Sequence, residues 1–238
     1  MKQGKNDGGA PQGFRCFPRE AFEFLLGLRK HNNREWFQAH AAEYEAFCLE
    51  PAKRFVEAVG PELRTFMPGI RFEPRVLGSI FRITRDTRYA NQDRLYKDHI
   101  DFYFWEGERR RATSGLFARL SPDFLGVGAG CHRFEKDELK RFREALNAPR
   151  VAADLAEIAR EVEKHGYKLK GDHYKRIPSG LSVPGPVERF ALFDALYVHV
   201  DEAPELALRD GAMLSASVRH WRALADLHRW LTAHVQSD

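Results

Sequence analysis

Apolar residues recur at helical spacing through the first third of the chain, which predicts a run of helices there. Pro18 suits the first position of one helix, Asn33 can cap a second, and Pro51 can open a third. Met67-Pro68-Gly69 should end the third helix, because this tripeptide favours a turn. The first third is therefore expected to be helical.

The middle of the chain follows a period of two, which is typical of strands with one buried face. The segments that alternate are residues 79–86, 99–105, 113–120 and 124–130. The connections between them are short, whereas a parallel crossover needs a dozen or more residues. These segments should form an antiparallel meander.

Helical spacing returns after Arg133 and continues to about residue 165. Residues 166–186 contain several glycines and prolines and are interpreted as a loop, and a late strand is expected around residues 196–200. Residues 213–235 should form one long final helix. Helices before and after a single antiparallel sheet predict an α+β fold.

A chain of 238 residues that is 43% hydrophobic can bury one full core. No linker or internal repeat divides it. We expect a disordered N-terminal tail over residues 1–12, which are polar and rich in glycine, and a single α+β domain over residues 13–238.

Charge and cysteine content narrow the function classes. The net charge of +4 permits anionic partners without demanding nucleic acid. The three cysteines are scattered and show no Cys-x-x-Cys spacing, which indicates a cytoplasmic protein without a disulfide framework. No apolar run approaches the ~20 residues that a membrane helix needs, so no membrane association is expected. The sequence leaves the oligomeric state open.

Charged side chains gather between the first two expected strands. The candidates for ligand binding there are Arg82, Arg85, Asp86, Arg88 and Lys97. Guanidinium groups bind phosphate and carboxylate groups with two parallel hydrogen bonds, so this cluster could hold a small anion. The alternative is a solvated loop whose ion pairs each contribute little to stability.

His99 and Asp101 are the candidates for acid–base catalysis. They share one face of an expected strand, so Asp101 could orient His99, and the ordinary pKa of histidine lies near neutrality. Lys175 and Arg176 lie in the later loop and could fold over the same anion site. The simpler interpretation of those two residues is an exposed loop.

Other chemistry has weaker support in the sequence. His99 and Asp101 could share a metal with His132, His173 or His199, but no metal-binding motif is present, and neither a metal nor any other cofactor is predicted. The glycines of residues 126–130 lack the spacing of a phosphate-binding loop, so we interpret them as a strand with close backbone packing.

The charged stretch also resembles a known family. Arg85-Asp86-Thr87-Arg88-Tyr89 followed by Tyr96-Lys97-Asp98-His99 resembles the "RDxRF … PYKxH" core of the family called domain of unknown function 2461, although Arg94-Leu95 stands where the family usually has Ser-Pro. Residues 32–37 (NNREWF), 126–130 and 174–180 are similar to its flanking stretches. The resemblance extends from about Phe17 to Val235 and implies no activity.

Two functions from different classes follow from these observations. The first is a protein that binds a small anionic ligand on its central sheet, with acid–base chemistry as an option. The second is a non-catalytic module that binds a protein or a nucleic acid through the same basic loop. A concave pocket would favour the first function, and a flat or convex face the second.

Overall fold

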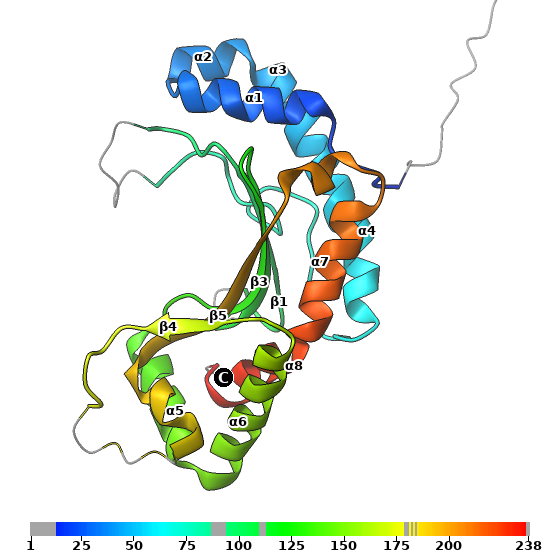
Figure 1. Cartoon of the computed structure of the whole chain (residues 1–238). Helices are drawn as coiled ribbons and strands as arrows, with labels where there is room; N and C mark the ends of the chain where they lie inside the picture. Colours follow the sequence, from blue (N-terminus) through cyan, green and yellow to red (C-terminus); the bar gives the residue numbers. More distant parts are fainter. Residues whose placement is uncertain are drawn as a thin grey trace, which may run out of the picture.

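The fold is organised around one antiparallel sheet with the strand order β1-β2-β3-β5-β4 (Figure 1). The computed structural model describes residues 13–86, 94–109, 113–178, 181, 183 and 185–236. Its strands are β1 (Ile100–Trp105), β2 (Gly115–Leu120), β3 (Leu125–Cys131), β4 (Leu169–Asp172) and β5 (Phe193–Glu202). The expected tail, residues 1–12, lies outside the described residues.

Helices precede and follow the sheet in sequence, which confirms the α+β class. The first group is α1 (Arg19–Lys30), α2 (Arg34–Ala39), α3 (Ala41–Glu43), the π-helical turn η1 (Tyr44–Leu49) and α4 (Glu50–Arg64). The later group is α5 (Lys136–Asn147), α6 (Pro149–Lys164), the 3₁₀ turns η2 (Gly185–Leu192) and η3 (Pro204–Leu208), α7 (Ala212–Ala223) and α8 (Ala225–His234).

Of the three helix starts expected in the first third, one is as predicted and two differ, the first being that Pro18 is the N-cap residue before α1 rather than its first helical position. Asn33 caps α2, since its side-chain oxygen accepts the Trp36 N–H at 2.8 Å. Pro51 does not open a separate helix: α3, η1 and α4 are continuous. In η1 the Glu50 N–H donates five residues back, to the Glu45 carbonyl, and this wider turn leads into α4 next to a proline that has no N–H of its own.

The predicted meander of β1, β2 and β3 is confirmed, but the segment at residues 79–86 is not a regular strand. It meets β1 through an isolated antiparallel bridge between Ile80 and Phe102, in which Tyr103 N–H donates to the Ser79 carbonyl at 2.9 Å. The buried residues Ile80 and Ile83 are three positions apart, while Phe81 is 39% exposed. Burial therefore does not follow the period of two on which the prediction depended.

Two later predictions also need correction. The segment interpreted as a loop contains β4, a four-residue edge strand with a bulge between Lys170 and Asp172. The expected final helix is broken at Leu224, which leaves helical geometry (φ −101°, ψ 3°) between α7 and α8. The break lets both helices contact β3. No glycine or proline marks the break, so the residue pattern could not predict it.

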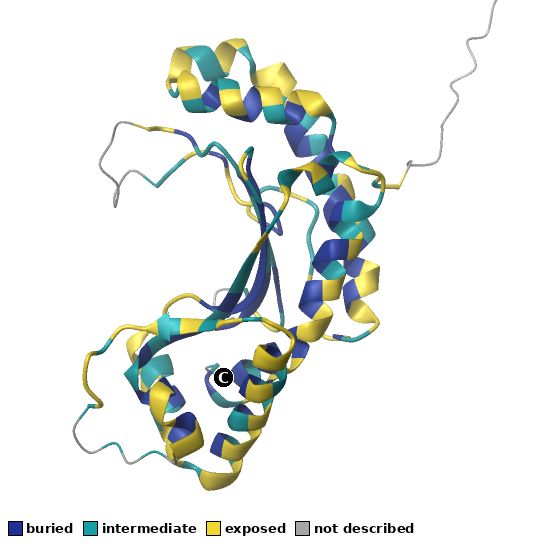
Figure 2. Ribbon diagram, viewed as in Figure 1, coloured by how far each residue is buried: buried dark blue, intermediate teal, exposed yellow. Residues whose placement is uncertain are grey.

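The two faces of the sheet differ. Apolar side chains of β1, β2 and β3 fill one face, and α4 and α7 stand along it (Figure 1), with buried residues gathered between them and the sheet (Figure 2). Among the described helices, none lies across the middle of the opposite face in this view. We call that opposite side the open face.

Candidate functional site

The open face displays rows of cross-strand neighbours. Asp101 on β1 pairs with Arg119 on β2, which pairs with Gly126 on β3. In the next row Tyr103, Phe117, Gly128 and His199 follow one another across four strands. The row beyond it contains Trp105, Gly115, Gly130 and Tyr197. Charge therefore lies at one end of the face and aromatic rings at its centre.

Because β3 has glycines on the open face, residues 125–130 project no side chains on this side of the sheet. Gly126, Gly128 and Gly130 all point to the open side, while Leu125, Val127 and Ala129 fill the core. A Cβ atom at Gly128 would stand 2.1 Å from the Val198 carbonyl oxygen and 2.4 Å from Phe117 Cζ. The rings of neighbouring strands thus lie directly over glycine backbone. The predicted close backbone packing of this strand is confirmed.

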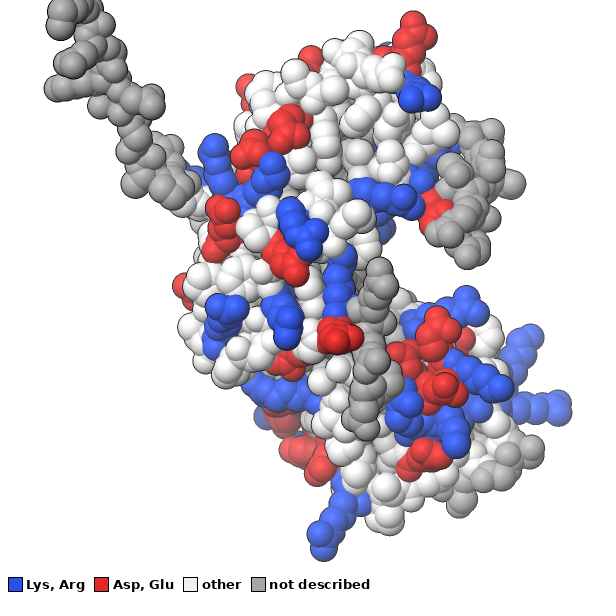
Figure 3. Space-filling view, turned by 180° about the vertical axis from the view of Figure 1, so that it is seen from behind, with Lys and Arg blue, Asp and Glu red and all other residues white. Residues whose placement is uncertain are grey.

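A hollow of about 360 Å³ lies over these strands, and we call it the sheet hollow. Its lining includes Phe81, Lys97, Tyr103, Phe117, Arg119 and His132. Seen from behind, the molecule is indented between its upper and lower parts on the side of the open face (Figure 3). The site is concave, and its walls are partly charged and partly aromatic.

Asp101 is the centre of charge in the sheet hollow. It accepts Lys97 Nζ at 2.9 Å and Arg119 Nε at 2.7 Å, so one carboxylate serves two cations. Burial alone would raise the pKa of Asp101, but the hydrogen bonds and charges of His99 and Arg119 outweigh burial and hold it well below the usual range. The group stays ionised, and the trio of Lys97, Arg119 and Asp101 carries one net positive charge.

His99 stands behind this trio rather than in the hollow. Its Nδ1 lies 3.2 Å from Asp98 Oδ1 and its Nε2 lies 3.4 Å from Asp101 Oδ2, and the side chain is only 12% exposed. Both ring nitrogens thus face carboxylates. The geometry suits a residue that positions Asp101 better than one that exchanges protons with a ligand.

Asp98 contacts arginines from helix α1 and from the neighbouring loop. Arg29 from α1 reaches it with Nε at 2.7 Å, and Arg85 lies 3.9 Å away while donating its own Nε to the Tyr96 carbonyl. Burial would raise the pKa of Asp98, and the hydrogen bonds from Arg29 and His99 lower it further than burial raises it. Arg85 is therefore engaged in holding the loop.

Of the other predicted residues, those that the structure describes do not line the sheet hollow. Arg82 pairs with Asp86 at 3.5 Å beside a neighbouring hollow of about 410 Å³, which shares Phe81 and Lys97 with the first. Arg88 lies outside the described residues.

Lys175 and Arg176 follow the far end of β4. The Asp172–Phe193 pair at that end is eight residues of β5 from Asp201, in the row of Asp101, and three from Leu196, which pairs with Cys131 in the lining of the sheet hollow. Neither Lys175 nor Arg176 is among the residues that line the sheet hollow.

Sequence reasoning did not place Arg119 in a binding site, and it considered His132 and His199 only as ligands of a metal that His99 and Asp101 could share. His199 Nε2 lies 2.7 Å from Asp201 Oδ1, and the His132 ring packs 4.5 Å from Phe117 and 4.1 Å from Tyr197, measured between centroids. Desolvation by these rings, and the nearby charges of His199 and Arg119, lower the pKa of His132 below its usual range. The signal that could have found them is the alternation of glycine along β3, which marks a face without side chains.

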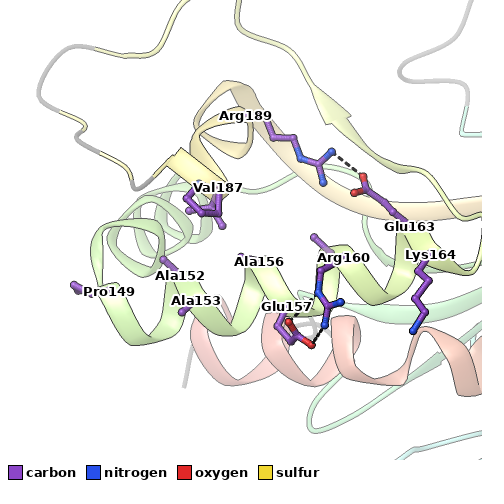
Figure 4. Close-up of a pocket in the computed structure, with 12 residues that line it drawn as sticks. Pro149, Ala152, Ala153, Ala156, Glu157, Arg160, Glu163, Lys164, Val187 and Arg189 are labelled. Carbon is purple, nitrogen blue, oxygen red and sulfur yellow. Dashed lines mark hydrogen bonds and ion pairs between the residues drawn. The ribbon is translucent and has the colours of Figure 1, made fainter.

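A larger hollow of about 780 Å³ lies between α6 and η2 (Figure 4). Four of its charged side chains form two pairs, Arg160 with Glu157 and Arg189 with Glu163, and alanines of α6 line much of the rest. Among the described residues, no group of three or more His, Cys, Asp and Glu side chains is arranged to hold a metal, here or elsewhere. The sheet hollow is the better candidate because it combines charge, histidines and aromatic rings.

The described helices include none that is long and apolar enough to cross a bilayer. Comparison with curated proteins and with solved structures gives no match. A family model described as "Conserved hypothetical protein (DUF2461)" matches residues 20–230, which include every strand of the sheet and the whole of the sheet hollow. The chain therefore belongs to the DUF2461 family.

Proposed function

We propose that this protein binds a small anionic ligand, carrying a carboxylate or a phosphate group, in the sheet hollow. The observation that carries the proposal is the pair of cations, Lys97 and Arg119, which share the single carboxylate of Asp101 beside a concave opening. Their unbalanced positive charge is what an anion would neutralise. Because Arg119 uses Nε for Asp101, the two terminal amino groups of its guanidinium are the ones placed to meet a ligand.

The surroundings strengthen this interaction. Lys97 is held over the Phe81 ring, with Nζ 5.0 Å from the ring centroid, and the aromatic walls reduce the screening that water gives an exposed ion pair. Asp101 and His99 fix the two cations, so little side-chain freedom is lost when the anion arrives. His132 and His199 line the hollow and are better placed than His99 for acid–base chemistry on a bound anion.

The alternative function, a module that binds a protein or a nucleic acid, has less support. The volume of the sheet hollow falls at the lower end of the range of about 300–1,000 Å³ that is usual for small-molecule pockets. Arg82 and Asp86, two charged residues of the basic loop, line a second hollow rather than a flat strip. Nucleic-acid binding remains an outcome that the experiment below can detect.

Thermal unfolding in the presence of inorganic phosphate, citrate and acetate tests the proposal. A ligand at a hundredfold excess over its Kd stabilises the folded state by about 2.7 kcal/mol, which raises Tm by roughly 5–10 °C in a chain of this size. Lys97→Met removes the charge and keeps most of the stem, so we expect the Tm shift to be lost.

The matched control is Lys140→Met on α5. Lys140 is an exposed lysine that lies 3.8 Å from Glu144 and is not among the residues that line the hollow. The Lys140→Met variant should show the same Tm shift as wild type. If Lys97→Met binds each anion as wild type does, the anion site is elsewhere. If oligonucleotides stabilise the protein and none of the three anions does, the interaction module is the better description.

A further inference from the structure

Resting on the proposed function, we infer that the anion bound in the sheet hollow is carried on a planar aromatic or heteroaromatic ring. Tyr103, Phe117 and His199 belong to one cross-strand row of the open face, and all three are half-buried, so that part of each ring is exposed. The His132 ring extends this row toward Tyr197. The floor of the hollow is therefore aromatic over much of its width.

The glycines fix this aromatic floor in place. A Cβ atom at Gly115 would stand 2.2 Å from Cε2 of Tyr103, and one at Gly126 would stand 2.8 Å from Cε1 of His199. The rings occupy the space that side chains would fill on an ordinary strand. Rings held against backbone in this way have little freedom to lose when another ring stacks on them, and stacking of this kind tolerates many ring types.

The spacing of charge and ring sets the size of the occupant. Arg119 and Phe117 are two residues apart on β2 and share the open face, so their Cα atoms are separated by roughly 6.6 Å. One ring with an acid group attached to it spans such a distance, and a mononucleotide spans it through its sugar. The shared chemistry is a flat ring bearing a carboxylate or a phosphate.

Pairs of probes that differ only in the ring test the inference. Phenyl phosphate is compared with inorganic phosphate, and benzoate with cyclohexanecarboxylate, by titration followed through backbone amide NMR shifts. We expect each aromatic member to bind more tightly and to move the amide signals of Gly126 and Gly128 through its ring current. Uridine monophosphate, titrated in parallel, distinguishes a nucleotide from a simple aryl acid by whether its Kd lies below that of phenyl phosphate.

Phe117→Leu keeps an apolar side chain and removes the ring. This variant should weaken the binding of phenyl phosphate on the order of tenfold, within the range that stacking on one aromatic side chain gives. Its affinity for inorganic phosphate should be unchanged. Phe66→Leu is the matched control, because Phe66 is also half-buried but packs under Arg222, outside the sheet hollow.

The outcomes separate this inference from the proposed function. If ring-free and aromatic anions bind equally in wild type and in Phe117→Leu, the anion site stands and the aromatic inference is wrong. If no probe of either kind binds, the proposed function fails, and the inference fails with it. If affinity rises steadily with the length of an oligonucleotide, the aromatic row is part of an extended nucleic-acid surface, and the small-ligand inference is overturned.

Discussion

Asp101 shows how one residue can hold a site together. Its carboxylate contacts Lys97 from the loop, Arg119 from β2 and His99 from the bend just before β1. The sequence predicted that Asp101 and His99 share a face, but it assigned catalysis to His99. The actual distances put His99 between two carboxylates, and this arrangement depends on the fold of the loop that carries Asp98, which no local pattern specifies.

Replacing Asp101 tests this role through the dependence of stability on pH. The pKa of Asp101 is lowered in the folded protein, so the folded state binds fewer protons than the unfolded state at this group. Its contribution is complete above the ordinary aspartate pKa of about 3.9 and declines as pH falls below that value. Asp101→Asn should lower the free energy of unfolding by about 1–3 kcal/mol at pH 7, because two cations lose their shared partner.

The free energy of unfolding, measured in urea between about pH 6 and pH 2.5, provides the check. Wild type should lose stability more steeply than Asp101→Asn over the acid part of this range. Parallel curves would mean that Asp101 titrates alike in the folded and unfolded states. Asp210→Asn is a suitable control, since Asp210 forms an ion pair with Arg15 that is largely exposed to water.

At the scale of elements, β3 determines both the core and the hollow. Its odd-numbered residues are apolar and its even-numbered residues from 126 to 130 are glycine, so one strand packs tightly on one side and presents bare backbone on the other. A substitution on the glycine side should therefore affect stability and ligand access together.

Gly128→Ala should destabilise the protein by about 1–3 kcal/mol, the usual cost of overpacking, because the new Cβ meets a carbonyl oxygen as well as a ring. Gly185→Ala is the control, since the described atoms leave open space for 4 Å around its Cβ position. Urea denaturation of both variants gives the comparison. Equal stability of the two would show that β3 can move away from its neighbours.

Strong periodicity allowed much of the fold to be predicted. The helices of the first third, the meander of β1 to β3 and strand β5 follow from their sequence patterns. The sequence missed β4 because its four residues, Leu-Lys-Gly-Asp, show no apolar alternation, and it missed the break at Leu224 because only tertiary contacts with β3 require it. Both omissions concern structure that packing imposes.

The candidate site was harder to predict for a related reason. Lys97 and Asp101 were found because they are close in sequence to other charges. Arg119, His132 and His199 come from three other segments, and the strand register brings them to the same face. Lys175 and Arg176 were grouped with the site through composition, and neither of them lines the sheet hollow.

At the scale of the molecule, one hydrophobic cluster includes residues from the helices that precede the sheet and from those that follow it. Phe55 on α4 packs on Phe102 of β1, and Trp221 on α7 packs on Phe104 of the same strand. The two groups of helices therefore depend on a common layer.

We predict that the protein unfolds in a single cooperative transition. Trp36 belongs to the first group of helices and Trp230 to the last, so tryptophan fluorescence samples both. Its denaturation curve should superimpose on that of far-UV circular dichroism. Two separated transitions would show that the helices on either side of the sheet in sequence fold independently.

Trp221 gives this arrangement an optical consequence. Its indole N–H donates to the carbonyl oxygens of Gly128 at 3.0 Å and of Phe117 at 3.3 Å, the two residues at the middle of the hollow floor. A single layer of backbone thus separates a buried fluorophore from whatever occupies the open face. The fluorescence emission of Trp221 should therefore respond when a ligand occupies the hollow. An added dye would have to enter the hollow itself, whereas Trp221 lies on the other side of the sheet.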